Sequence, residues 1–356
     1  MEAESVLNEV APDGGVDAYV EQDGRVAYFY LRSEDEDFGI RSCWVRNLQA
    51  APAKLDVEGM RKGVPPMLPA QFCRHASGAA PLESQRLRVV WFEEGDAAAL
   101  LENDRILAVI PGWAGQNGFH GYARDCIGQG PLCWQLDEQN ALNDRVRRYD
   151  EYWASWSTEQ GPWHEVQSSQ CEAYSRDLGQ HQQYYAIDGE KWPPKAMLRI
   201  DRPNASVLAT VGVSLRAQPR VEQYADDPRP YRRIELATAQ TPDFAARYLM
   251  PFATYLSGQA QFPWSRRAWL GPFHTIPCDA FADGGPFAAI LLVRDPPDLP
   301  AVALPTFRAD PVNVLWTVPI TESEHRYAQQ ESGRKLWEKL NAAGHGAITA
   351  TRRPVV

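Results

Sequence analysis

The chain has 356 residues, is 44 % hydrophobic and carries a formal net charge of −10. A chain of this length is too long for one ordinary core, so it favours a globular protein of two domains. Residues 1–150 contain 24 of the 46 acidic residues and 15 of the 36 basic residues, so their net charge is −9. The remaining residues have a net charge of −1. Because an acidic surface repels phosphates, this distribution argues against nucleic-acid binding and favours a basic partner.

Neither secretion nor membrane insertion is indicated. The first ten residues, MEAESVLNEV, have no basic start and no apolar stretch of a secretion signal, and the longest strongly apolar run, residues 287–293, is too short to cross a bilayer. The six cysteines include no CxxC pair, and a chain with this much core does not need disulfides. We therefore expect a cytoplasmic protein that makes no membrane contact.

The first part of the chain is typical of β-structure. Apolar, β-branched and aromatic runs predict strands at residues 25–32 and 40–48, and residues 86–111 predict a β-meander with a turn at Asn103-Asp104. The pattern indicates a β-rich N-terminal domain over residues 1–138.

The period of the apolar residues changes from Asn140 onward. Leu142, Val146 and Tyr149 recur at helical spacing, so we assign the helix that they predict to a second domain, residues 139–356. Strand-like runs follow, and a helical segment then carries an internal proline that predicts a kink or two shorter helices. The runs are 182–188, 195–201, 206–215 and 232–239, and the helical segment is 243–257 with Pro251.

An abrupt change of character occurs near the end of the chain, in PVNVLWTVPITESEHRYA (residues 311–328). Its apolar first part predicts a buried strand that ends at Pro319. Thr321 followed three residues later by Glu324 predicts a capping box, with a helix that begins near Glu322. This pattern indicates a structural junction and requires no ligand to explain it.

The order of these segments resembles the Suppressor of fused domain family. The matching stretches are VLATVGVSL (207–215), RRIELA (232–237), PDFAARYLMPFATYL (242–256), FAAILLVRDP (287–296) and LPTFRADPVNVLWTVPITESEHRYA (304–328), followed by the LWEKL helix. The resemblance covers about residues 170–345 and rests on the order and spacing of the segments.

The resemblance implies an α+β fold with a mixed sheet flanked by helices. It also implies a binding protein rather than an enzyme: animal relatives sequester a transcription factor of the Hedgehog pathway, and many bacterial relatives look like immunity proteins that neutralise toxins. The N-terminal domain matches less of the family pattern, although WFEEGDAAALLENDRILAVIPGW and GFHGYARDC are similar to bacterial members.

A glycine-rich loop, residues 111–131, contains most of the chain's candidate chemistry. His120, Tyr122, Arg124 and Cys126 lie within seven positions of one another. Three interpretations remain open: aromatic residues that pin the loop to its sheet, a partner-binding surface with His120, Tyr122 and Arg124, or a Cys–His hydrolase site. We expect no catalytic residues, no metal and no cofactor, since the remaining His and Cys residues lack metal-site spacing and the glycine steps lack a phosphate-loop context.

Two further stretches are candidates for contact with a protein. The run SEDEDFG (residues 33–39) places carboxylates at a predicted hairpin tip, where they would attract a basic partner. The segment FPWSRRAWLGPFH (residues 262–274) combines the residue types that dominate binding hot spots in a turn-rich context. The candidate residues are Glu34, Asp35, Glu36, Asp37, Trp264, Arg266, Arg267 and Trp269.

The sequence thus predicts a non-enzymatic cytoplasmic protein that binds another protein, and the resemblance favours a bacterial immunity protein that occludes a toxin. The alternatives are a Cys–His hydrolase with its site in residues 111–131, and a regulatory scaffold that binds a peptide by strand addition.

Overall fold

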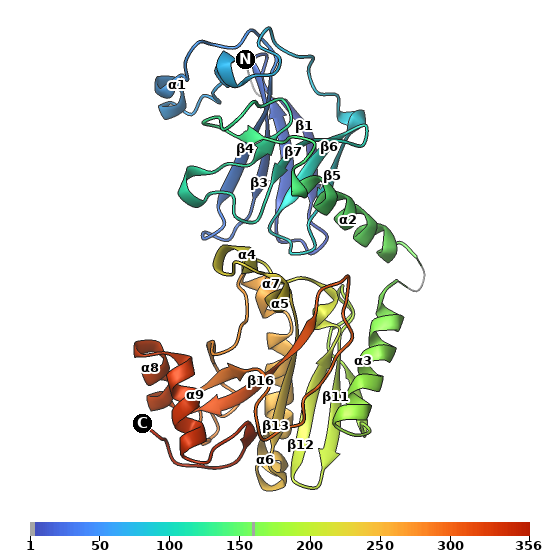
Figure 1. Ribbon diagram of the computed structural model, residues 1–356, viewed down its shortest axis with the longest axis vertical. Helices are drawn as coiled ribbons and strands as arrows, with labels where there is room; N and C mark the ends of the chain where they lie inside the picture. The colour runs from blue at the N-terminus through green and yellow to red at the C-terminus, as the bar shows by residue number, and fades with distance from the viewer. Residues whose placement is uncertain (1–3, 159–160) are drawn as a thin grey trace. The chain divides into compact units, whose positions relative to one another are not determined.

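The computed structural model describes residues 4–158 and 161–356 and divides into compact units, residues 1–158 and 159–356 (Figure 1). The first unit is built from β-sheets. The second contains a mixed sheet flanked by helices, so the predicted α+β class is confirmed. Of the helices described, none combines the length and the apolar character needed to span a membrane.

The first unit consists of sheets ordered β1-β2-β3-β4 and β5-β6-β7-β8-β9. The predicted meander is confirmed as β5-β6-β7, and its second turn contains Asn103 and Asp104 at positive φ, which suits these residue types. Strands β1 and β2 were not predicted. The elements are β1 Glu4–Val10, β2 Asp17–Gln22, β3 Val26–Arg32, β4 Ile40–Asn47, α1 Val57–Arg61, β5 Leu87–Trp91, β6 Ala98–Glu102, β7 Arg105–Ile110, β8 Tyr122–Ala123, β9 Trp134–Gln135 and α2 Ala141–Trp156.

Alternate residues of β5–β7 point to opposite sides of their sheet. Trp91, Leu100 and Ala108 pack with Phe29 and Trp44 of the first sheet. The intervening residues face the other way and form a separate cluster. This period of two is the reason that the sheets form a sandwich with apolar residues on both faces of the second sheet.

Helix α2 belongs to the N-terminal unit, whose boundary falls at residue 158 rather than at the predicted residue 138. Its predicted apolar face, Leu142, Val146 and Tyr149, packs on the outer residues of β5–β7. Arg88 of β5 also pairs with Asp150 at 2.9 Å. Amphipathic spacing correctly predicts the helix, but it does not say which of two cores the apolar face will cover.

The second unit contains a sheet ordered β10-β11-β12-β13-β16-β15-β14, with β17 beside β13. The pairs β13–β16 and β13–β17 are parallel and the others antiparallel. The elements are α3 Trp163–Asp177, β10 Gln183–Ala186, β11 Ala196–Arg202, β12 Ala205–Val211, α4 Val221–Tyr224, α5 Arg229–Arg232, β13 Arg233–Gln240, α6 Pro242–Gln259, α7 Phe262–Ser265, β14 Thr275–Pro277, β15 Ala289–Val293, β16 Val312–Ile320, α8 Glu322–Gln330, α9 Gly333–Ala342 and β17 Ile348–Thr349.

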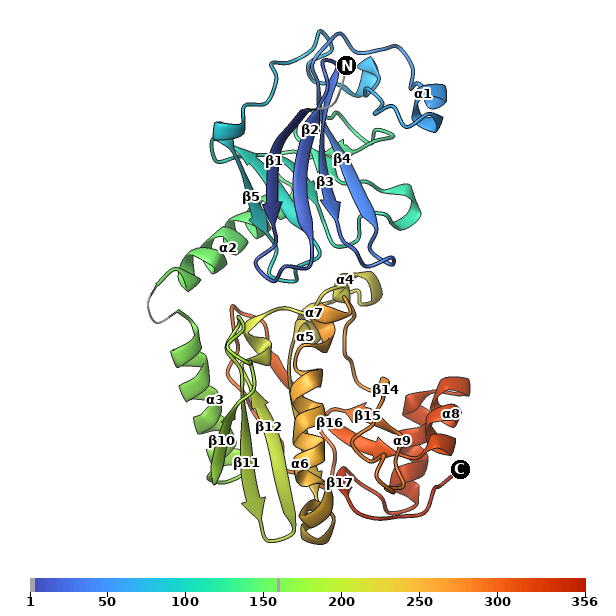
Figure 2. The same cartoon turned by 180° about the vertical axis from the view of Figure 1, so that it is seen from behind.

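Helices cover both faces of this sheet. Helix α6 runs along one face, where Phe252 and Leu256 pack on Ile234 and Leu236 of β13 (Figure 2). Helices α3, α8 and α9 contribute to the cluster on the other face, which includes Trp316 of β16. Because both faces are covered, every residue of β13 and all but one of β16 are buried, without the alternation of buried and exposed residues seen in a sheet with one open face. Helix α6 is continuous through Pro251, so the predicted division into two helices does not occur.

The predicted strand-to-helix junction is confirmed. Strand β16 is followed by α8, whose capping box joins Thr321 and Glu324 in both directions. Glu324 is fully buried, and its carboxylate also accepts from Arg352 (Nη2 to Oε2, 2.9 Å) and from the Val355 N–H (3.0 Å). Burial alone would raise the pKa of Glu324, but the hydrogen bonds from Arg352, Thr321 and Val355 outweigh it and lower the pKa. The capping carboxylate therefore also holds the C-terminal segment.

We predict that Glu324→Gln destabilises the protein by about 3 kcal/mol at pH 7, because it leaves Arg352 without its buried partner. The folded-state pKa of Glu324 lies below its ordinary value of 4.5, so this contribution is complete above about pH 4.5 and declines as the pH falls through the folded pKa. Urea unfolding of wild type and variant at a series of pH values measures the difference. Glu322→Gln, at an exposed position of the same helix, is the control; equal losses in both variants would contradict the assignment.

Candidate functional site

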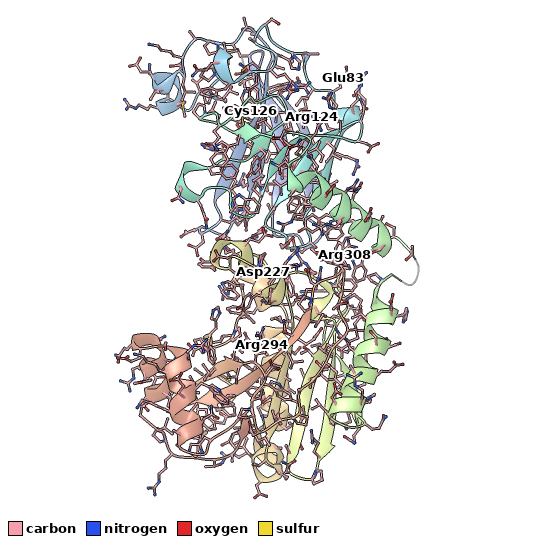
Figure 3. All side chains as sticks on the ribbon, in the orientation of Figure 1. Glu83, Arg124, Cys126, Asp227, Arg294 and Arg308 are labelled. Atoms are coloured by element: carbon pink, nitrogen blue, oxygen red, sulfur yellow. The ribbon has the colours of Figure 1, made fainter. Side chains whose placement is uncertain are left out.

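A pocket lies at one end of the sheet in the second unit. Strands β13 and β16 are parallel and β15 is antiparallel to β16, so the start of β13 and the end of β15 meet at the same end. Tyr231 comes just before β13 and Arg294 just after β15, and both line the pocket. Asp227 and Arg294, labelled in Figure 3, belong to this lining.

Four aromatic side chains line the pocket together with charged residues, prolines and an alanine, and the pocket has a volume of about 660 Å³. Tyr224 stacks on Trp269 with ring centroids 6.2 Å apart, and Tyr231 meets Trp269 edge-on at 5.6 Å. Tyr224 is 65 % exposed beside Trp269, so an aromatic surface at the pocket is open to solvent. The volume is in the range of protein ligand-binding pockets.

The walls of the pocket are held together by Gln218, which is 1 % exposed. Its side-chain amide donates to the carbonyls of Tyr231 (2.8 Å) and Leu270 (3.0 Å), and its Oε1 accepts from the Leu270 N–H (2.9 Å). These bonds join the segment before β13 to the one that carries Trp269. Since a buried amide must satisfy its donors and acceptor, Gln218 fixes the spacing of Tyr231 and Trp269.

Helix α9 closes another side of the pocket. The guanidinium of Arg334 lies 4.5 Å from the centre of the Phe273 ring. The close approach requires glycine at the preceding position, because a Cβ on Gly333 would lie 2.0 Å from the carbonyl oxygen of Phe273. Arg334 and Phe273 thus form a cation–π pair on the pocket wall.

The pocket contains both positively and negatively charged side chains. Arg294 pairs with Asp295 at 3.6 Å, and Arg229 holds the pKa of Asp227 below its usual range. Burial lowers the pKa of His274, whose ring packs edge-on against Trp269. This mixture of aromatic rings, cations and carboxylates suits the recognition of a side chain or a loop of another protein.

Hydrogen-bonding groups remain available on the aromatic side chains. Within residues 4–158 and 161–356, no hydrogen bond is made by the Nε1–H of Trp269 or by the hydroxyls of Tyr224 and Tyr231. An aromatic side chain with an open polar end can both bury area and donate to a partner.

The structure separates the residues predicted in the segment 262–274. Trp269 lines the pocket, whereas Trp264 is 7 % exposed, packs in the core beside α6 and donates from Nε1 to the Ala217 carbonyl at 3.0 Å. Arg266 is exposed and Arg267 is buried. Trp264 and Arg267 therefore have little surface to offer a partner, because the turn-rich stretch is packed down around them.

The predicted acidic residues lie at the hairpin between β3 and β4. Glu34, Glu36 and Asp37 are exposed and Asp35 is half-buried. The Asp35 carbonyl accepts from two backbone N–H groups, which closes the turn. Three exposed carboxylates at one tip give this part of the N-terminal unit a strong local negative charge.

The glycine-rich loop does not bring His120 and Cys126 together as a hydrogen-bonded pair in the described structure. Cys126 is fully buried, and its thiol is bonded to the Cys133 carbonyl at 3.3 Å. Tyr122 packs on Phe119 with ring centroids 5.0 Å apart. His120 is half-buried, and Arg124 lines a different cavity in the same unit. Most of this loop thus packs onto its own sheet.

Within the described ranges, no group of three or more His, Cys, Asp or Glu side chains is placed to hold a metal ion. His274 instead accepts at Nδ1 from the Gly271 N–H at 3.3 Å.

The sequence did not predict the pocket residues Tyr224, Tyr231, Phe273, Arg294 and Arg334, nor the buried Gln218 that joins two of the pocket's walls. They come from segments far apart in the chain and share no local pattern. The stretch DDPRPY, residues 226–231, indicates a proline-containing turn, but a turn signal alone does not show that its tyrosine lines a pocket.

Comparison with known proteins identifies the second unit. Residues 191–354 match the family model described as Suppressor of fused protein (SUFU), so this segment is a SUFU domain. No curated protein matches the chain. Similar solved structures include a putative SUFU homolog from Neisseria gonorrhoeae FA 1090 (13 % identity, 54 % of this chain and 98 % of that chain, TM-score 0.38) and a Sufu-Fu complex (14 % identity, 54 % and 91 %, TM-score 0.39).

Trp264 is buried in the core and Trp269 lines the pocket, so we expect their removal to lower the stability of the protein by different amounts. We expect Trp264→Ala to destabilise the protein by about 3–5 kcal/mol, because it removes a buried ring and leaves the Ala217 carbonyl without its donor. Trp269→Ala should cost about 1 kcal/mol, since its ring faces an open pocket. Urea unfolding followed by circular dichroism tests this order, and a larger loss for Trp269→Ala would contradict it.

Proposed function

We propose that this chain is a non-enzymatic protein-binding protein, and that its SUFU domain grips a partner protein through the pocket lined by Tyr224, Tyr231, Trp269 and Phe273. The observation that carries the proposal is the exposure of Tyr224 beside Trp269 over a cavity of about 660 Å³. Tyrosine, tryptophan and arginine dominate binding hot spots, and Arg294 and Arg334 stand on the same walls.

The pocket alone is too small to be a whole protein interface. Stable interfaces bury about 1,200–2,000 Å² in total, so a side chain or loop of the partner would fill the pocket while the surrounding surface excludes water. The acidic hairpin at residues 33–39, on the N-terminal unit, would raise the association rate of a basic partner at low salt.

The finer proposal is that the partner is a toxin and that binding neutralises it by steric occlusion. The resemblance of residues 170–345 to the Suppressor of fused domain family, many of whose bacterial members look like immunity proteins, supports this assignment. A protein that only covers the active or binding surface of a toxin needs affinity and a complementary shape. Such a mechanism makes and breaks no covalent bond.

Pocket substitutions test the binding proposal. Tyr224→Ala and Trp269→Ala should each weaken binding of a toxin encoded next to this protein by about tenfold or more, chiefly through faster dissociation. Met250→Ala, an exposed position on α6, is the matched control and should bind as wild type does. Surface plasmon resonance measures the rates. Unchanged dissociation from both pocket variants would overturn the pocket assignment.

Neutralisation has its own readout. The wild-type protein should protect a cell that expresses the toxin, and the Trp269→Ala variant should protect less in proportion to its lost affinity. If the bound partner is not toxic, the proposal that the partner is a toxin is contradicted. The proposal that the pocket binds a protein is then unaffected.

The hydrolase alternative makes an opposite prediction for Cys126. A hydrogen bond with Cys133 and contacts with backbone N–H groups outweigh burial and lower the pKa of the Cys126 thiol, but its side chain is fully buried. We therefore predict that iodoacetamide modifies the half-buried Cys171 before Cys126 in the native protein, as peptide mass spectrometry would show. Faster modification of Cys126 near neutral pH would favour the hydrolase.

A further inference from the structure

A second site lies in the N-terminal unit and includes Arg124 of the glycine-rich loop. Arg74, Arg105 and Arg124 come from separate segments and converge on a cavity of about 420 Å³. An adjoining cavity of about 420 Å³ shares Arg105, Arg124 and Glu138 and adds Asn103 and Asn143 to the lining. The N-terminal end of α2 forms one rim, and Leu136 contributes an apolar wall.

Backbone hydrogen bonds place the main chain of Arg74 and Arg124, while the side chains of Arg74 and Arg105 are exposed. The Arg74 N–H donates to the Asp125 carbonyl and the Arg124 N–H to the Leu107 carbonyl, each at 2.8 Å. Arg105 starts β7 directly after the tight turn of the meander. The Nε of Arg124 donates to the Ile106 carbonyl at 2.6 Å, which restrains its guanidinium on the cavity wall.

The carboxylates of Asp104, Asp137 and Glu138 line the same cavities, and among the described residues they do so without pairing directly with the three arginines. Asp104 is paired with Arg88 at 2.9 Å, and in the part of the chain that the structure describes no ion pair joins Arg74, Arg105 or Arg124 to an acid. Burial, followed by repulsion from Arg105 and Arg74, lowers the pKa of Arg124 against the attraction of Asp125 and Glu138. Cations held together in this way are stabilised by a bound anion.

The other lining groups define the rest of the ligand. Glu138 and Asp137 are hydrogen-bond acceptors beside the arginines, and Asn103 and Asn143 extend the polar lining in the adjoining cavity. Carboxylates next to an anion site accept hydrogen bonds from hydroxyl groups, as they do from sugars in nucleotide-binding proteins. We propose that these adjoining cavities bind a phosphate ester of a sugar, with the phosphate on Arg74, Arg105 and Arg124 and the hydroxyls on Glu138.

A polymeric anion fits this site less well. The lining itself contains Asp137 and Glu138, and residues 1–150 carry a net charge of −9, so a long polyphosphate would meet repulsion outside the cavity. A small ligand instead contacts individual side chains of the cavities, so its phosphate can lie on the arginines and its hydroxyl groups on the carboxylates. The cavity volumes are those of small-molecule sites.

The test is isothermal titration calorimetry of the full chain with ribose 5-phosphate, AMP, inorganic phosphate and ribose. Ribose 5-phosphate should bind saturably and more tightly than either inorganic phosphate or ribose. If AMP binds about tenfold more tightly than ribose 5-phosphate, the natural ligand is a nucleotide. If AMP and ribose 5-phosphate bind with equal affinity, the natural ligand is a free sugar phosphate.

Variants assign the contacts. Arg105→Gln and Arg74→Gln should each weaken ribose 5-phosphate about tenfold, because charge-assisted hydrogen bonds to phosphate are lost. Glu138→Gln should weaken ribose 5-phosphate while leaving inorganic phosphate unchanged or tighter. Arg86→Gln is the matched control, since Arg86 is exposed and pairs with Glu83, labelled in Figure 3, outside the cavities.

The proposal is overturned if no sugar phosphate binds saturably, or if the arginine variants bind ribose 5-phosphate as tightly as wild type does. The unfolding midpoints of these variants should equal that of wild type, which shows that the variants are folded. Binding of ribose 5-phosphate that equals inorganic phosphate and ignores Glu138→Gln would overturn the assignment of the hydroxyl groups.

Discussion

Glu235 is a charged side chain inside an apolar sheet, and the segment that leads to the pocket is built around it. Its fully buried carboxylate accepts from the Thr210 hydroxyl at 2.7 Å and from the N–H groups of Gly212 and Ser214 at 3.0 Å each. Burial raises the pKa of Glu235 although these donors oppose the shift. Because buried donors and acceptors must be paired, the chain after β12 can follow only one path. That path brings Gln218 between the segments that carry Tyr231 and Trp269.

The shape of the pocket therefore depends on hydrogen bonds of polar groups in the core more than on contacts among its own aromatic rings. The rings stand at the end of the sheet where β13 begins and β15 ends, and Gly333 lets α9 approach closely enough to set Arg334 over Phe273. A rigid frame with an exposed Tyr224 suits recognition, because little conformational entropy is lost when the partner binds. The same logic applies to the arginine cavity of the N-terminal unit, where backbone hydrogen bonds place the main chain of Arg74 and Arg124.

What the sequence could and could not predict follows from the range of the interactions. The meander turn at Asn103-Asp104 and the capping box of Thr321 and Glu324 depend on neighbours within a few residues, so local patterns identify them. The face of α2 was also evident, but its choice of core depends on contacts far apart in sequence. Trp264 and Trp269 lie in one segment and look alike in sequence, yet only the packed structure places one in the core and the other in the pocket.

The central claim is that a partner protein contacts the pocket of the SUFU domain, and a photo-crosslinker placed by turns at position 224 and at position 250 tests it directly. Both positions are exposed, and both lie in the second unit. The account predicts a crosslinked protein of defined mass from position 224, located by mass spectrometry to one loop of the partner, and none from position 250. Equal crosslinking from both positions, or crosslinking from position 250 alone, would contradict it.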